Sequence, residues 1–170
     1  MALTKVQAEG INLADAFVFS GAVTGTAGDN TPSFYGVLAS DQSINNTTWT
    51  KLLIATESWD TDSAFASNKF TIPSGEGGKY VIGFSIATTT TIDDGERVIG
   101  KLYINGAANN FTLANDWSPT SSRDLFINHS TVLNLSATDY VELYAYQNDG
   151  AAANILAIHT SFWGFKLRGV

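Results

Sequence analysis

The chain has 170 residues, 44% of them hydrophobic and 15% charged, which suits one packed domain and leaves no room for a second. Nine basic against sixteen acidic residues give a net charge of −7, which argues against nucleic-acid binding because each phosphate contact needs a Lys or Arg. With no cysteine, neither disulfides nor thiolate metal sites are available.

The N-terminal residues 1–31 differ from the rest of the chain. Strand-like alternation surrounds Phe17 and Phe19, and a stretch rich in Gly, Thr, Asp and Asn then leads to Pro32. We interpret this segment as an arm with a short strand and a flexible link, whose two phenylalanines anchor the protein to a larger particle. An extra edge strand of the main domain is the alternative.

Short predicted strands follow Pro32 at spacings of roughly 8–12 residues, the pattern of a β-sandwich or jelly roll. They cover residues 34–39, 49–57, 69–73, 78–87, 97–104, 110–114, 124–128, 131–135, 139–147 and 155–168. Turns such as Asn105-Gly106 and Asn148-Asp149-Gly150 separate them, since these residues tolerate positive φ. The sequence therefore predicts an all-β, antiparallel jelly-roll β-sandwich over residues 32–170.

One strand has two apolar faces. In residues 140–147, alternation places Val, Leu and Ala on one side and Tyr140, Glu142, Tyr144 and Tyr146 on the other. A monomer needs only the first side, and an aromatic surface left in water usually marks an interface. Phe162 and Trp163 are adjacent and cannot both enter one core, so we place Phe162 in the same interface. Singly exposed tyrosines are the alternative.

Several fragments, in one order, resemble a known family. They are Trp59-Asp60-Thr61, Ala64-Phe65, Lys69-Phe70-Thr71-Ile72-Pro73, Gly78-Lys79-Tyr80, Ile104-Asn105-Gly106, Thr138-Asp139-Tyr140-Val141 and Phe162-Trp163-Gly164. The set is similar to the jelly-roll family of complement globular heads and tumour necrosis factor ligands, in its bacteriophage and bacterial branch. Thr138 stands where that family usually has Gly. The resemblance implies a homotrimer with an aromatic-rich face at a threefold axis.

Catalytic motifs are missing from the sequence, which has no nucleophile elbow and no zinc-protease motif. Glu57, Asp60 and Asp62 flank Trp59 and would suit a glycosidase. The resemblance instead makes this Asp-Thr position a structural element at the start of a strand. We therefore expect no enzyme and no cofactor, and keep a polysaccharide-degrading enzyme as a weak alternative.

Two turns offer candidate sites of other kinds. Asp93, Asp94 and Glu96 could supply oxygen ligands for calcium, although their spacing fits no defined calcium motif and a solvated turn is the favoured interpretation. Trp117, in the polar stretch 115–119, places a large amphipathic ring where little surrounds it. We predict that it is a contact residue at an exposed pole of the jelly roll. A ring folded back onto its own domain, where it would add to thermal stability, is the alternative.

Together these features predict a bacteriophage virion structural protein, displayed as a trimer on the virion surface. A head decoration or capsid cement protein is favoured, and a tail-fibre tip or host-receptor-binding module is the alternative. A carbohydrate-binding, lectin-like module is an alternative of another class. The expected partners are further copies of the chain, a major capsid or tail protein and a host-surface glycan. Nucleic acid is excluded, and so is membrane insertion, since no apolar run approaches roughly 18 residues.

Overall fold

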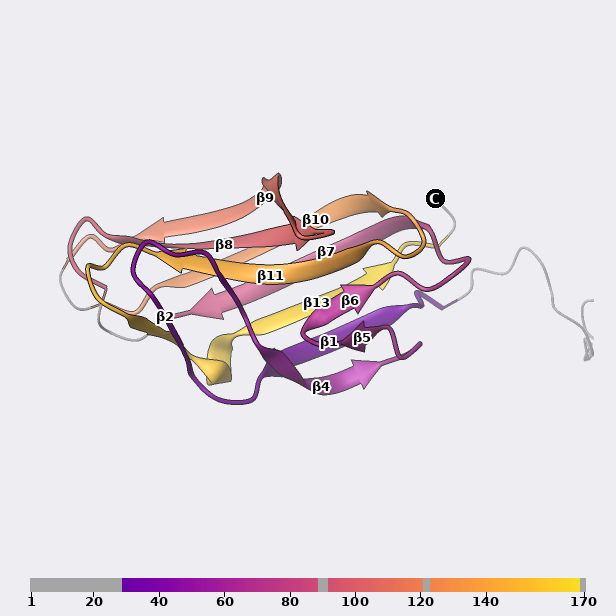
Figure 1. Ribbon diagram of the computed structural model, residues 1–170, viewed down its shortest axis with the longest axis horizontal. Helices are drawn as coiled ribbons and strands as arrows, with labels where there is room; N and C mark the ends of the chain where they lie inside the picture. Colours follow the sequence, from indigo (N-terminus) through magenta and orange to yellow (C-terminus); the bar gives the residue numbers. More distant parts are fainter. Residues whose placement is uncertain (1–28, 89–91, 121–122, 169–170) are drawn as a thin grey trace, which may run out of the picture.

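The computed structural model describes residues 29–88, 92–120 and 123–168. Phe17 and Phe19, the predicted anchor residues, lie outside these ranges. Within them the chain is all-β apart from one turn of 3-10 helix, η2 (Ala157–His159), and the described part holds no helix of the length and hydropathy that a membrane span needs. The predicted fold class is confirmed as a sandwich of antiparallel sheets (Figure 1).

Two main sheets form the sandwich. The first has the strand order β10-β7-β13-β1-β4. Its strands are β1 (Ser33–Leu38), β4 (Ile54–Asp60), β7 (Gly78–Ala87), β10 (Phe126–Leu135) and β13 (Ser161–Lys166). The second has the order β5-β6-β11-β8-β9, with β3 also paired to β11. Its strands are β3 (Thr50–Lys51), β5 (Phe65–Ala66), β6 (Lys69–Thr71), β8 (Arg97–Ile104), β9 (Ala107–Trp117) and β11 (Tyr140–Gln147). A short ladder joins β2 (Gln42–Ile44) to β12 (Ala153–Ile155).

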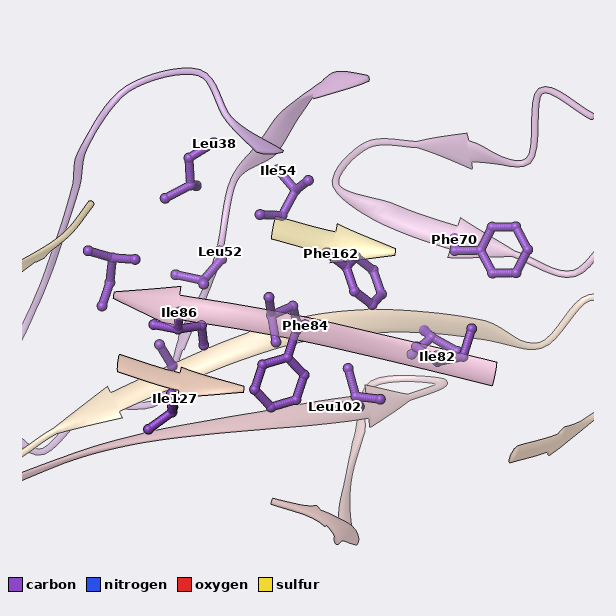
Figure 2. Close-up of a cluster of buried hydrophobic side chains, with 14 of the residues drawn as sticks. Leu38, Leu52, Ile54, Phe70, Ile82, Phe84, Ile86, Leu102, Ile127 and Phe162 are labelled. Carbon is purple, nitrogen blue, oxygen red and sulfur yellow. The ribbon is translucent and has the colours of Figure 1, made fainter. Parts of the chain in front are cut away.

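Alternating side chains build the core between the two sheets. In β7, Tyr80, Ile82, Phe84 and Ile86 are buried and face the second sheet. They meet inward residues of β8 and β11, among them Leu102, in one continuous apolar cluster (Figure 2). Burial of apolar side chains between the sheets supplies most of the stabilisation of such a sandwich.

Strand limits follow the sequence prediction where alternation is clean and depart from it where polar residues interrupt. Strands β7 and β8 have the predicted limits. The two predicted strands 124–128 and 131–135 are one strand, β10, because the polar Asn128 and Ser130 face outward while still pairing with β7. The predicted strand 155–168 is divided into β12, η2 and β13.

The turn before β11 holds a strained residue. Thr138 has φ of 74°, in the left-handed region that a β-branched side chain disfavours. The adjacent Asp139 carboxylate accepts hydrogen bonds from the Asn105 side-chain amide at 2.8 Å and from the Ser136 backbone N–H at 2.7 Å. These bonds lower the pKa of Asp139. The turn is therefore held by Asp139 rather than by the backbone preference of Thr138.

Replacing Thr138 with glycine should stabilise the protein. Glycine adopts positive φ without steric cost, and this gain exceeds the entropy that glycine adds to the unfolded chain. We expect the free energy of unfolding to rise by about 1 kcal/mol and the melting temperature by about 2–4 °C. Thermal and urea unfolding measure both quantities. The control is Thr138→Ala, which keeps a Cβ and should gain little; an equal gain in both variants would contradict the role of φ.

Candidate functional site

The outward side of the first sheet is largely aromatic. It carries Tyr35 of β1, Trp59 of β4, and Trp163 and Phe165 of β13, which we call the tryptophan face. The cross-strand register places Tyr35 opposite both Trp163 and Trp59, so three rings form one row. Tyr35 and Trp59 stack with ring centroids 5.0 Å apart, and Trp163 and Phe165 stack at 6.3 Å.

An open pocket of about 430 Å³ lies in this face. Its lining is mostly apolar and consists of Asn30, Ser33, Phe34, Tyr35, Trp59, Trp163, Gly164 and Phe165. Gly83 on β7 leaves room for the Trp163 indole to pack against that strand, because a Cβ at position 83 would come within 2.3 Å of the ring. Trp59 remains 52% exposed in the single chain. An apolar hollow of this size on a monomer surface is typical of an interface or a ligand site.

The outward side of the second sheet carries the predicted tyrosines. Tyr140, Tyr144 and Tyr146 lie on it as alternation predicted, together with Tyr103 of β8 and Trp49, and we call these five residues the tyrosine face. Its rings pack on one another: Tyr103 and Tyr144 stack at 3.8 Å, and Trp49 lies 5.4 Å from Tyr146. Burial raises the pKa of both Tyr103 and Tyr144.

Phe162 does not lie with the tyrosines, and its predicted place in the interface is wrong. It belongs to β13 of the other sheet, faces inward and is fully buried within one chain. Its ring meets Phe34 edge to face at 4.9 Å, and Figure 2 shows it directed into the core. The adjacent residues were correctly expected to face opposite ways, but Trp163 is the outward one.

Trp117 is the last residue of β9, so residues 115–117 are strand rather than the predicted loop. The indole is half exposed, and the Arg97 guanidinium lies 4.9 Å from the ring centroid. This cation–π contact covers part of the ring. A contact role for Trp117 stays a prediction.

The three carboxylates near Trp59 differ in their hydrogen bonds and in their exposure. Asp60 accepts the backbone N–H groups of Ala64 at 3.0 Å and of Phe65 at 2.8 Å, closing the turn between β4 and β5. Glu57 and Asp62 are exposed. Asp60 therefore holds the turn between the Trp59-Asp60 and Ala64-Phe65 fragments. Its role is structural, as the resemblance implied, but it ends a strand rather than starting one.

The calcium candidates Asp93, Asp94 and Glu96 are not gathered into a site. Within the described ranges, no three acidic, His or Cys side chains are placed to hold a metal ion. The backbone N–H of Asp93 donates to the Asp149 carboxylate at 2.6 Å, which ties this turn to the turn after β11.

Comparison with known proteins identifies the fold. The globular domain of zebrafish complement 1qA superposes with a TM-score of 0.60 at 16% identity, over 81% of this chain and 98% of that one. Murine APRIL gives 0.59 at 11% identity over 79% and 98% of the two chains, and the Eiger TNF of S. frugiperda gives 0.58 at 12% over 79% and 90%. The likeness shows the fold. The sequence matches no family model and no curated protein.

The tryptophan face is the site that sequence reasoning missed. Its signal was present, because Trp163 and Phe165 alternate with buried residues just as the tyrosines of β11 do. What the sequence does not reveal is the partner of that strand. Only the pairing of β13 with β1, and of β1 with β4, brings Tyr35 and Trp59 beside Trp163.

Proposed function

We propose that the chain is a bacteriophage virion structural protein that forms a surface-displayed homotrimer and serves as a head decoration or capsid cement protein. The observation that carries self-association is the tryptophan face, an aromatic surface with an open apolar pocket. Leaving these rings in water is unfavourable by about 25 cal/mol per Å² of apolar surface. A second copy of the chain is the occupant we propose.

A second exposed apolar surface lies on the same chain. Strands β9 and β10 close one side of the sandwich, at the top of Figure 1. Phe111 on β9 is 91% exposed, and Phe126 and Val132 on β10 are more than half exposed. A projecting apolar edge that enters a hollow on the next copy makes a heterologous contact, which closes into a ring when the rotation between neighbouring subunits closes and otherwise forms an open filament. We infer three subunits per ring from the family resemblance.

The virion placement rests on the fragments that resemble the bacteriophage branch of the family. Their structural roles support that resemblance: Asp60 closes a turn, Asp139 closes another, and Asn105-Gly106 forms the turn from β8 to β9. A tail-fibre tip remains the alternative placement. In either placement the arm, residues 1–31, attaches the trimer to a capsid or tail protein.

Assembly can be tested with one variant on each face. The native protein should scatter light as three 18.2 kDa subunits at micromolar concentration. Trp163→Glu should dissociate it to monomers, because each copy would bury an unpaired charge in the contact. Tyr144→Glu should leave the trimer intact. The reverse pattern would move the contact to the tyrosine face, as the sequence alone predicted, and a native monomer would rule out the homotrimer.

Attachment to the particle needs a separate measurement. Virions that lack this protein, when mixed with it, should bind the full chain and should not bind the Phe17→Asp, Phe19→Asp double variant. Light scattering on the double variant provides the control, since a trimer that fails to attach places the defect in the arm. Full occupancy by the double variant would contradict the anchor.

A further inference from the structure

The tyrosine face concentrates positive charge in an acidic protein. Four basic side chains point to it or border it: Lys51, Lys69, Arg97 and Lys101. They are four of the nine basic residues of a chain whose net charge is −7. Glu142 lies on the same side and pairs with one of them, Lys51, at 2.6 Å. With Lys51 neutralised by Glu142, Lys69 and Lys101 are the cations on this face whose charge remains available to an anionic ligand.

Aromatic contacts hold these cations in place. The Lys101 ammonium lies 4.8 Å from the centroid of Trp49 and donates to the Asn110 side-chain oxygen at 3.2 Å, and its residue is only 9% exposed. The Lys69 ammonium lies 4.4 Å from the centroid of Tyr140. Neither lysine forms an ion pair within the described residues. Both charges are positioned before any ligand arrives, which reduces the entropy lost on binding.

The tyrosines add hydrogen-bonding groups to the same surface. The side chains of four tyrosines on this face are half-buried: Tyr103, Tyr140, Tyr144 and Tyr146. Within the described residues, their hydroxyl groups have no hydrogen-bond partner. Tyr80 shows the contrast, since its hydroxyl lies inside the molecule and donates to the Glu76 carbonyl at 2.6 Å. Phenols are protonated at neutral pH, and burial raises the pKa of Tyr103 and Tyr144 further, so these hydroxyls can donate.

We infer that the tyrosine face binds an acidic polysaccharide, with sugar rings against the aromatic rings and carboxylate or sulfate groups at Lys69 and next to the largely buried ammonium of Lys101. Flat rings with polar edges complement sugars, which present both C–H faces and hydroxyls. The fixed ammonium groups select an anionic chain over a neutral one. The trimer contact proposed above lies on the opposite sheet, so this site faces outward in the assembly and is also complete in a monomer.

Binding of defined polymers to the full-length protein tests the inference. The probes are polygalacturonate, dextran sulfate, neutral dextran and polyglutamate, the last of which carries carboxylates without sugar rings. We expect polygalacturonate, dextran sulfate or both to bind, weakly at high salt, and dextran and polyglutamate to bind at least tenfold more weakly. Failure of both acidic polysaccharides, or equal binding of polyglutamate or dextran, would overturn the proposal.

Conservative variants locate the site. Tyr144→Phe with Tyr146→Phe removes two hydroxyls and keeps the rings, so we expect about tenfold weaker binding with unchanged melting temperature. Lys69→Gln should weaken binding and reduce its salt dependence. Tyr35→Phe, the matched change on the tryptophan face, should bind as the native chain does. An equal loss in Tyr35→Phe, or no loss in the double variant, would place binding elsewhere. Light scattering on each sample separates this result from failure of the trimer.

Discussion

Replacing Phe162 with alanine should lower the free energy of unfolding by about 3–5 kcal/mol, the cost of removing a large, fully buried aromatic ring and leaving a cavity. The ring has no exposed surface, and it contacts Phe34 and Phe65 edge to face at 4.9 and 6.0 Å. Edge-to-face pairs add to the burial energy, so the loss should lie toward the upper end. Urea unfolding followed by tryptophan fluorescence measures it.

The neighbouring residue provides the control. Trp163→Ala alters the outward side of the same strand, so we expect a fold stability close to native for the isolated subunit and a weaker assembly. Unfolding at several protein concentrations separates the two effects, because only a subunit contact makes the midpoint depend on concentration. If Phe162→Ala left stability within 1 kcal/mol and abolished assembly, Phe162 would be an interface residue after all.

Much of the fold could be predicted because its signals are local. The alternation of β7 and β8 fixed their limits, and Asn105-Gly106 marked a turn in which both residues have positive φ, 53° and 77°. Asp60 bonds the backbone of Phe65, and Asp139 bonds that of Ser136, within a few residues of their own positions, although Asp139 also accepts the more distant Asn105 amide. Local hydrogen bonding leaves a pattern in the sequence that single-chain reasoning can detect.

The arrangement of the surface could not be predicted in the same way. Alternation shows that a strand has two sides, but not which side meets the other sheet when both carry aromatic residues, as at Phe162 and Trp163. The lysines of the tyrosine face come from three strands, β3, β6 and β8, brought together only by long-range pairing. Non-local pairing of this kind is the part of a β-fold that sequence patterns specify least.

A second large effect is expected at Asp60. Asp60→Ala should destabilise the protein by about 3 kcal/mol, because the backbone N–H groups of Ala64 and Phe65 would both lose a charged acceptor. Both residues are buried, so water cannot fully replace the carboxylate. Asp62→Ala, a change in an exposed carboxylate two residues away, should stay within about 0.5 kcal/mol of native.

The same pair of variants distinguishes a turn-forming Asp60 from a catalytic one. A residue that closes a turn gives Asp60→Asn an intermediate stability, since the amide oxygen still accepts one backbone N–H while the charge is lost. If Asp60 is structural, removing its carboxylate lowers the free energy of unfolding, and the native chain shows no saccharide turnover. A catalytic carboxylate gives the opposite result, with near-native stability and a lost activity, as expected when functional groups are not optimised for the fold. Polysaccharide hydrolysis by the native chain that Asp60→Asn abolished without a change in melting temperature would establish the enzymatic alternative over the structural one.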